Sequence, residues 1–380
     1  MDEPTTALSV TEAERLHAII RRLASEGVGI VYISHRMEEV FELATTIPVL
    51  RDGAVAGRLP AAEATRRGLI RLMVGREVQD FLTRRGAGTD PAARPQAKPP
   101  VLSVRDLWLA HPRPTAERPR LVDGVSFDVA AGEVLGLAGL MGAGRSEVFE
   151  TLFGARASAS GGRVAIDGEP VAIRSPAEAK RAGLALVTED RKRDGLVLEA
   201  RVDFNLALPV MRRLAAAFLV SRRAERDLAF RQIRSLGIRT RGPRQAAGTL
   251  SGGNQQKVVL GKWLETGPRV LLLDEPTRGI DVGAKAEIYR LIEDLKARGI
   301  AVVLASSELP ELTALSDRIL VLRDGRPTAL LDRPDFSPDL ILDYASPGGA
   351  VQDAFRTDTP PPEAGSGRGA ARPDSAAPGR

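Results

Sequence analysis

The chain has 380 residues, of which 43% are hydrophobic but only 4% aromatic, and this fits about two to three domains with cores of aliphatic side chains. It contains no cysteine, which excludes disulfides, thiolate zinc sites and cysteine nucleophiles. The net charge of +5 would suit an anionic partner, but an arginine-rich composition with solvated faces explains it better, and we expect no nucleic-acid partner.

The first predicted region, residues 1–82, combines a short acidic motif with helix and strand patterns. Asp2–Thr5 reads Asp-Glu-Pro-Thr, and Ser9 with Glu12 forms a capping box before a helix with an apolar stripe. Residues 29–33 predict a short buried strand, and His35 follows it. A lone histidine in this place is either a polar cap or a catalytic group.

Changes in composition bound the second region, residues 101–345. Residues 83–100 are rich in Gly, Pro, Ala and Arg, which predicts an interdomain linker. Residues 346–380 are rich in Pro, Gly, Ser and Ala and predict a disordered tail.

A glycine-rich segment of the second region predicts a phosphate-binding loop. The apolar run Val134–Ala138 predicts a buried parallel strand, and residues 139–146 follow it with P-loop spacing. Glycines let backbone N–H groups converge on phosphate oxygens, and the start of the next helix adds partial positive charge. The alternative is a strand–helix turn without a ligand. The expected nucleotide-binding residues are Gly139, Gly142, Ala143, Gly144, Arg145, Ser146 and Glu147, with the Ser146 hydroxyl as a Mg²⁺ ligand.

One position of this loop departs from the pattern, because Arg145 stands where a P-loop has lysine. Arginine keeps the charge, but its planar fork is bulkier than an ammonium group. We therefore expect nucleotide binding with weaker support for the transition state.

Two acids end a second apolar run, residues 269–276. Asp274 at the tip of the expected strand suits a Mg²⁺ ligand, and Glu275 suits the residue that polarises an attacking water. The alternative is an acidic cap for the following helix, which a P-loop in the same module disfavours.

A third motif, Leu-Ser-Gly-Gly-Asn-Gln, opens a helix between these two. A serine cap and two glycines leave backbone N–H groups at a positive helix end, which favours an anion site facing away from the module's own phosphate loop. The residues are Leu250, Ser251, Gly252, Gly253, Asn254 and Gln255.

The chain also contains an internal repeat. Residues 2–5 recur as 274–277, an offset of 272 (274 − 2), and the same offset places Ser34 on Ser306 without a gap. Strands alternating with helices in both copies predict a parallel, doubly wound α/β sheet.

The order and spacing of these motifs resemble the ATP-binding cassette (ABC) ATPases, and more narrowly the two-cassette proteins of monosaccharide importers of the ribose, galactose and xylose type. The resemblance covers residues 101–340, with a partial match over the first 80. It implies a P-loop NTPase cassette with a parallel-sheet core, a small antiparallel β subdomain and a helical subdomain. A partial second cassette precedes it, so that residues 1–82 are the C-terminal part of a first cassette.

The resemblance also implies the partners and the chemistry. ATP and Mg²⁺ would bind between one cassette's P-loop and the other's signature. The cassette pair would drive membrane permease subunits at the cytoplasmic face, with a sugar-binding protein acting indirectly. In this family Glu275, Glu3 and His35 would be catalytic.

Several switch positions depart from the family pattern. Glu189 stands where a glutamine senses the γ-phosphate, and Ser307 stands where a histidine contacts it. Asp281 caps the helix after the acidic motif and keeps the subfamily pattern. Together with Arg145, these departures indicate the weaker site of a cassette pair.

Because the first cassette's P-loop and signature are not in this sequence, we expect no complete site within one chain, and impaired hydrolysis. A second copy or an intact paralogue would have to supply the partner cassette. A non-hydrolytic, degenerate cassette that serves assembly is the alternative function. No apolar run reaches the ~18–20 residues of a membrane helix, so we expect a peripheral protein whose membrane contact goes through its partner.

Overall fold

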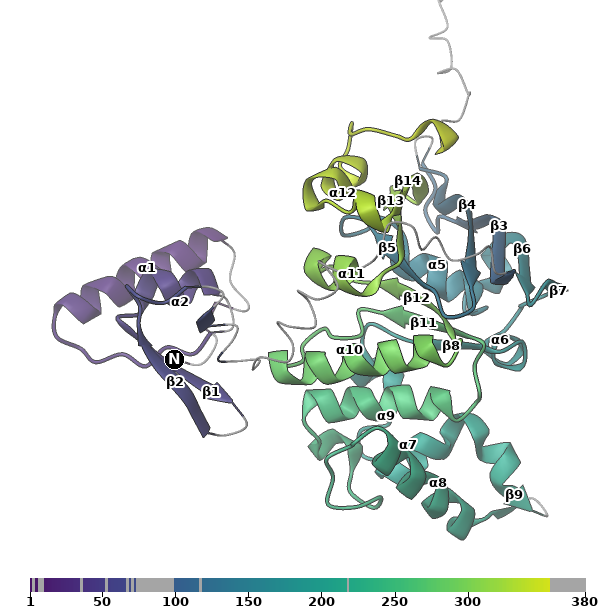
Figure 1. Ribbon diagram of the computed structural model, residues 1–380, viewed down its shortest axis with the longest axis horizontal. Helices are drawn as coiled ribbons and strands as arrows, with labels where there is room; N and C mark the ends of the chain where they lie inside the picture. The colour runs from purple at the N-terminus through teal and green to yellow at the C-terminus, as the bar shows by residue number, and fades with distance from the viewer. Residues whose placement is uncertain are drawn as a thin grey trace, which may run out of the picture.

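The computed structural model describes residues 1, 4–5, 10–34, 37–51, 54–65, 68–69, 72, 99–115, 118–216 and 219–355 (Figure 1). The described residues form two parts, one within residues 1–72 and one within residues 99–355. Glu3 and His35 lie outside the described residues, as does most of the expected linker.

A six-stranded sheet is the centre of the larger part, with the order β14-β13-β5-β12-β11-β8. All neighbours in it are parallel except the hairpin β13–β14. The strands are β5 (Val134–Ala138), β8 (Leu184–Val187), β11 (Val270–Asp274), β12 (Ala301–Ala305), β13 (Arg318–Arg323) and β14 (Arg326–Asp332).

Both faces of this sheet are covered, which explains the unbroken apolar runs of its strands. On β11, Leu271 and Leu273 face one core together with residues of the helices α9 and α10. Val270 and Leu272 face a second core, which includes Phe149 of α5. The expected α/β fold with a parallel-sheet core is therefore confirmed.

A second, antiparallel sheet packs over the second core, in the order β4-β3-β6-β7. Its strands are β3 (Pro100–Ala110), β4 (Arg120–Ala130), β6 (Ser160–Ile166) and β7 (Glu169–Val171). This is the antiparallel β subdomain that the sequence predicts. It begins at Pro100, inside the expected linker.

Helices surround the six-stranded sheet. They are α5 (Arg145–Leu152), α6 (Pro176–Arg181), α9 (Gly252–Leu264), α10 (Val282–Ala297), α11 (Leu309–Leu315) and α12 (Pro338–Ala345). Helix α10 follows strand β11, and helix α11 follows strand β12. The loops that precede these two helices therefore lie at the carboxyl edge of the sheet. Ligands of open α/β sheets bind at this edge.

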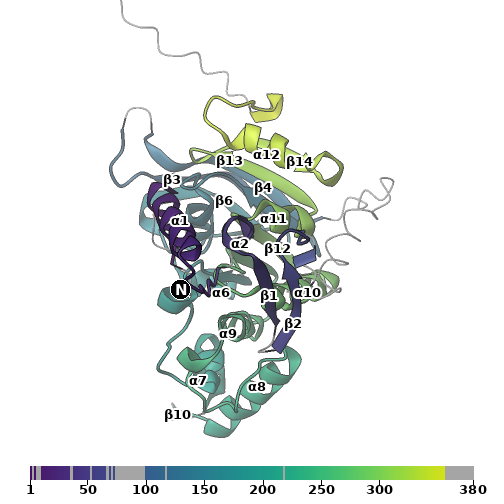
Figure 2. The ribbon, with the colours of Figure 1, turned by 90° about the vertical axis from the view of Figure 1, so that its left-hand side faces the viewer.

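A helical subdomain lies at the end of the module opposite to the β13–β14 hairpin and α12 (Figure 2). It contains α7 (Val202–Ala207) and α8 (Arg222–Ser235), and the short pair β9 (Ala215–Ala216) and β10 (Leu219–Val220). The 3-10 and π segments described in the module are η1 (Ala157–Ala159), η2 (Arg191–Gly195), η3 (Leu208–Leu214), η4 (Ala247–Thr249), η5 (Arg333–Asp335) and η6 (Asp353–Phe355).

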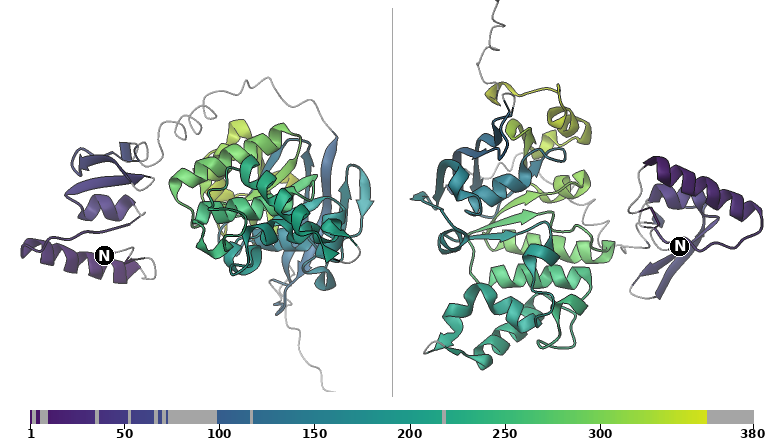
Figure 3. Two further views of the ribbon diagram at one scale, coloured as in Figure 1. Left: turned by 90° about the horizontal axis from the view of Figure 1, so that it is seen from below. Right: turned by 180° about the vertical axis from the view of Figure 1, so that it is seen from behind.

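The smaller part repeats two helices and the β-hairpin of the module at a constant offset along the chain. Its elements are α1 (Val10–Ser25), α2 (Met37–Leu43), β1 (Thr46–Arg51) and β2 (Ala54–Pro60), and α2 lies between α1 and the hairpin (Figure 3). Adding 272 to their bounds gives those of α10, α11, β13 and β14. Even the register shift recurs, between Val49 and Leu50 in one hairpin and between Val321 and Leu322 in the other.

The predicted buried strand at residues 29–33 is wrong. Val31 is 78% exposed and Ile33 is 53% exposed, and only an isolated bridge at Ile33 is present. The backbone pairs with Met1, whose carbonyl accepts from the Ile33 N–H at 2.9 Å. The equivalent strand β12 lies between β5 and β11, and no such neighbouring strands are present among residues 1–72 as described, so the apolar run has no sheet to enter.

Residues 346–355, the start of the expected tail, pack on the module. The Gln352 side chain accepts from the Leu330 N–H at 2.9 Å, and Phe355 contacts the second core. The Arg323 guanidinium donates to the carbonyls of Ser346 and Gly349, each at 2.9 Å. The folded module therefore extends to residue 355.

None of the described helices is both long and apolar enough to cross a membrane.

Candidate nucleotide site

The loop between β5 and α5 has the geometry of a phosphate cradle. Gly142 and Gly144 adopt left-handed conformations, with φ of 79° and 97°. A Cβ on Gly144 would lie 2.9 Å from the Leu121 carbonyl oxygen, so this position accepts only glycine. The helix that follows begins at Arg145, and its first N–H groups have no partner within the helix.

The two expected Mg²⁺ ligands meet at the start of this helix. The Ser146 hydroxyl lies close enough to the carboxyl of Asp274, which ends β11, to oppose the rise of its pKa. These residues are 128 positions apart (274 − 146), and the parallel pairing of β11 and β5 with β12 brings their strand ends together. Hydroxyl and carboxylate oxygens are the ligands that Mg²⁺ prefers.

The environment of Asp274 is adverse to a negative charge. Burial raises the pKa of this carboxyl to about 6, with a further rise from the neighbouring Glu275, while the Ser146 hydroxyl opposes the shift. A divalent cation at this place would stabilise the carboxylate form. The described residues hold no group of three or more acids, histidines or cysteines that could bind a metal alone, so an ion here would need oxygens from phosphates or water as well.

The Arg145 side chain contacts Ser306 and Glu275. Its guanidinium donates to the Ser306 carbonyl at 2.7 Å and to the Glu275 carboxylate at 3.2 Å. The Ser307 hydroxyl donates to the other carboxylate oxygen of Glu275 at 3.0 Å. Both side chains of the ion pair are largely buried, at 14% and 9% exposure. Glu275 is thus held by the two residues that replace lysine and histidine.

Glu275 also has a strained backbone, with a φ of +47°. Its N–H donates to the Ala305 carbonyl at 2.9 Å, which fixes the turn after β11 against the end of β12. A non-glycine residue in this conformation persists where its surroundings determine it, and such residues gather at functional sites.

Glu189 lies near these loops but is engaged elsewhere. Its carboxylate forms an ion pair with Arg278, and it is partly exposed. The next arginine, Arg191, donates to the carbonyls of Arg278 and Gly279 at 2.6 and 3.0 Å. The segment at 189–195 is therefore fastened to the loop before Asp281, whose carboxylate caps α10 by accepting from the Ala284 N–H at 2.9 Å.

The signature residues form a separate surface. Ser251 precedes α9 and accepts a hydrogen bond from the Asn254 amide at 2.8 Å, while Gln255 donates to the Leu250 carbonyl at 3.1 Å. Gly253 lies against α10, where a Cβ would come within 2.4 Å of the Ala284 Cβ. Among the described residues, the side-chain hydrogen bonds of this motif run to residues 191–254 and none runs to the phosphate loop.

The sequence prediction missed one buried group of this region. Glu311, on α11, accepts hydrogen bonds from Thr277 at 2.9 Å and from Ser306 at 2.5 Å. The repeat contains the signal that finds it, because Glu39 lies 272 residues before Glu311, as Thr5 does before Thr277. The remaining expected binding residue, Glu147, lies in the first turn of α5, where its charge raises the pKa of Asp274.

Comparisons with known proteins identify the module. A family model described as ABC transporter matches residues 122–278. The chain is 44% identical over 348 residues to the ribose import ATP-binding protein RbsA of Geobacillus kaustophilus (strain HTA426), covering 92% of this chain and 67% of that protein.

The chain belongs to the ABC transporter family. It is also 46% identical over 348 residues to a putative ribose/galactose/methyl galactoside import ATP-binding protein of Ralstonia nicotianae (strain ATCC BAA-1114 / GMI1000), covering 91% of this chain and 64% of that protein. The chain spans about two thirds of the length of these ABC relatives.

Solved ABC structures share the fold. A nucleotide-free ATP-binding cassette has a TM-score of 0.56 at 21% identity, covering 65% of this chain and 99% of that one. A dimeric cassette bound to ADP and Pi has a TM-score of 0.53 at 20% identity, covering 62% of this chain and all of that one (100%). The ABC cassette fold that the sequence predicts is confirmed. Membership in a family of ATPases follows from the family model and the ribose import relative.

Proposed function

We propose that this chain is the ATP-binding and ATP-hydrolysing subunit that energises import of a monosaccharide across the cytoplasmic membrane. The observation that carries the proposal is the meeting of Ser146 and Asp274 beside a glycine loop of P-loop geometry. The names of the ABC relatives, which are import ATP-binding proteins for ribose or galactose, support the class of substrate.

Bound ATP would be held by the residues at the carboxyl edge of the sheet. The backbone N–H groups of Gly142 and of residues 144–146 would donate to the phosphates, since the Ala143 N–H already donates to the Leu140 carbonyl. Ser146 with Asp274 would hold Mg²⁺, which neutralises phosphate charge. Glu275 would orient the water that attacks the terminal phosphate. Arg145 must leave Glu275 before its charge can reach the phosphates, so we expect slow hydrolysis by this cassette.

The proposed partners follow from the surfaces outside this site. The signature, residues 250–255, would complete a nucleotide site of a second cassette, either another copy or a paralogue. The helical subdomain would contact membrane permease subunits, and a sugar-binding protein would act through them. Exposed apolar side chains on this subdomain support that assignment: Val197, Leu208, Leu219 and Phe230.

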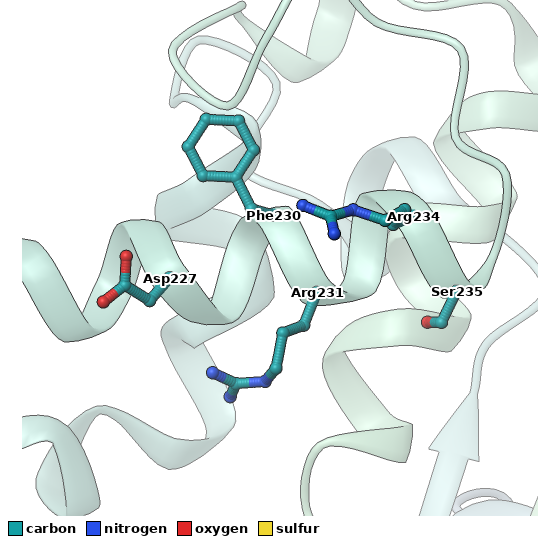
Figure 4. Close-up of a pocket in the computed structure, with 5 residues that line it drawn as sticks. All are labelled: Asp227, Phe230, Arg231, Arg234 and Ser235. Carbon is teal, nitrogen blue, oxygen red and sulfur yellow. The ribbon is translucent and has the colours of Figure 1, made fainter.

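Phe230 belongs to a shallow pocket on the outer face of α8 (Figure 4). The other lining residues are Asp227, Arg231, Arg234 and Ser235, which lie at helical spacing with Phe230. An aromatic ring flanked by arginines is typical of protein interfaces, and the permease is the partner that we assign to this end of the module. The protein would then be peripheral at the cytoplasmic face of the membrane.

Uptake in cells tests this function. We expect a strain without the gene for this chain to lose uptake of one labelled monosaccharide among ribose, galactose and xylose. The wild-type gene should restore uptake and an Asp274→Asn gene should not. Restoration by both genes would refute a role for the site in hydrolysis and favour the second candidate, a non-hydrolytic cassette, which the Arg145–Glu275 ion pair supports.

A further inference from the structure

A buried carboxylate outside the phosphate loop connects two loops of the nucleotide site. Thr277, three residues after Asp274, donates to one carboxylate oxygen of Glu311 at 2.9 Å, and Ser306 donates to the other at 2.5 Å. All three side chains are between 1% and 2% exposed. Glu311 therefore bridges the acidic loop after β11 and the switch loop after β12.

The two bridged loops hold Glu275 between them. Ser307 donates to its carboxylate from the switch loop, while the Ser306 carbonyl anchors the guanidinium of Arg145, which donates to the same carboxylate. The Ser306 hydroxyl also accepts from the Glu308 N–H at 3.1 Å. A displacement of Ser306 would consequently move both side chains that donate to the Glu275 carboxylate, Arg145 and Ser307.

The same network is present in the smaller part of the chain. Thr5 donates to Glu39 at 2.8 Å, and Ser34 donates to Glu39 at 2.9 Å. Each residue precedes its counterpart by 272 (277 − 5, 306 − 34 and 311 − 39). Residues 29–33 form no strand there, whereas β12 is a central strand, so the network forms in two different surroundings and is not a by-product of the sheet.

Glutamate is a costly residue at such a position. Removing a carboxylate from water is unfavourable unless hydrogen bonds compensate, and burial raises the pKa of Glu311 to about 7 although Ser306 and Thr277 oppose the shift. An apolar side chain would pack at this place without that cost. The retained carboxylate thus points to a role that needs two acceptor oxygens at a fixed separation.

We propose that Glu311 is a positioning residue, which through Thr277 and Ser306 sets the separation of the acidic loop and the switch loop. In this way it holds Glu275 and Ser307 in the positions where they would contact the terminal phosphate of a bound nucleoside triphosphate. The inference rests on the proposed nucleotide-binding function. Its effect falls on the third phosphate, because Glu311 acts on the switch loop and makes no contact with residues 139–146 among the hydrogen bonds of the described residues.

Comparison of ATP and ADP affinities tests the role. We expect Glu311→Gln to weaken ATP about tenfold, the effect of one disrupted buried hydrogen bond, in competition against a fluorescent ADP analogue. ADP affinity should stay within about twofold, since ADP lacks the group that the switch loop meets. A merely structural role would weaken both nucleotides together, and this result, or no change in either, would overturn the proposal.

Glu225→Gln is the matched control. Glu225 is also 2% exposed, but it lies on α8 and pairs with Arg222 at 3.2 Å, far along the chain from both loops. Its substitution should lower stability without changing the ratio of the ATP and ADP affinities. A change in that ratio equal to that of Glu311→Gln would show that general destabilisation explains both variants.

Variants of Thr277 test whether Glu311 acts through its hydrogen bond with Thr277. Thr277→Ser keeps the hydroxyl and should behave as the wild type, whereas Thr277→Val keeps the shape and should match Glu311→Gln. The double variant Thr277→Val/Glu311→Gln should be no weaker for ATP than either single variant, because the residues act through one contact. Additive losses of ATP affinity in the double variant would show that the two residues act independently, which would contradict the proposal.

Hydrogen exchange of the nucleotide-free chain separates this inference from the proposed function. Glu311→Gln should speed exchange about tenfold in residues 275–278 and 305–308, while Glu225→Gln should speed it in α8 only. A wild-type chain that binds no nucleotide would refute the proposed function. The exchange data would still show whether Glu311 connects the two loops. Unchanged exchange in both loops would overturn the proposed positioning role of Glu311.

Discussion

Arg145 donates a hydrogen bond to the carboxylate of Glu275 at 3.2 Å, and so the residue that replaces the P-loop lysine engages the residue expected to orient water. The same guanidinium reaches the Ser306 carbonyl at 2.7 Å. A lysine ammonium is a single compact charge and lacks the fork that spans both acceptors. On the proposed function, we therefore expect this cassette to bind nucleotide more readily than it hydrolyses it.

The first prediction concerns Arg145→Lys. The substitution should free Glu275 and give the phosphates a compact charge, so we expect the rate of phosphate release from MgATP to rise at least about tenfold, a typical effect of one oriented group. Steady-state phosphate release measures it. Arg156→Lys is the control, because Arg156 forms an exposed pair with Glu150 and should have little effect. An unchanged or lower rate in Arg145→Lys would contradict the explanation.

The second prediction concerns the stability cost of Asp274. Burial raises the pKa of this carboxyl to about 6, so its ionised form opposes folding at neutral pH. Asp274→Asn should raise the free energy of unfolding at pH 7.5 by about 1–3 kcal/mol without nucleotide. Urea denaturation measures the change. At about pH 3, where the acid is mostly protonated in both states, most of the gain should vanish. A gain of equal size at both pH values would contradict the shifted pKa.

The third prediction uses the buried Lys262 of α9. Its ammonium donates to the Gly195 carbonyl, and burial lowers its pKa to about 8. Between pH 8 and about 10.5 the unfolded chain binds more protons at this group than the folded chain, so its contribution to the unfolding free energy rises with pH. The difference between wild type and Lys262→Met should grow in favour of the wild type by about 3 kcal/mol over this window. A difference independent of pH would contradict the shifted pKa.

The fourth prediction compares two glycines of the signature. Gly253→Ala should destabilise the protein by about 1–3 kcal/mol, because its new methyl group meets the fixed Cβ of Ala284 at 2.4 Å. Gly252→Ala should cost less, since the atoms nearest to its Cβ are the Arg191 guanidinium at 2.9 Å and the Gly279 carbonyl oxygen at 3.1 Å, both farther away than 2.4 Å. Thermal unfolding of both variants measures the difference. Equal losses would show that α9 can move away from α10.

Much of the module could be predicted because its signals are local. The bounds of β5 coincide with the apolar run Val134–Ala138, and Asp281 caps α10 as its sequence position indicates. The repeat predicted matching elements, and an offset of 272 reproduces the bounds of two helices and two strands. Local pattern and tertiary packing agree at these places.

The rest depends on neighbours that no local pattern contains. Residues 29–33 have the same apolar character as β12, but a strand is stable only beside other strands, and none flanks them in the described part of residues 1–72. The contact of Arg145 with Glu275 joins residues 130 positions apart, so the motifs predicted both residues without their ion pair. The role of Glu311 needed the structure, although the repeat already aligned it with Glu39.

The most direct measurement of the central claim is a titration of the chain with a fluorescent ATP analogue, with and without Mg²⁺, in the wild type and in Asp274→Asn. We expect saturable binding by both proteins, tightened at least about tenfold by Mg²⁺ in the wild type only, because Asp274 is the carboxylate that would hold the ion. Absence of saturable binding, or an equal response to Mg²⁺ in both proteins, would contradict the assignment of the site at Gly139–Ser146 and Asp274.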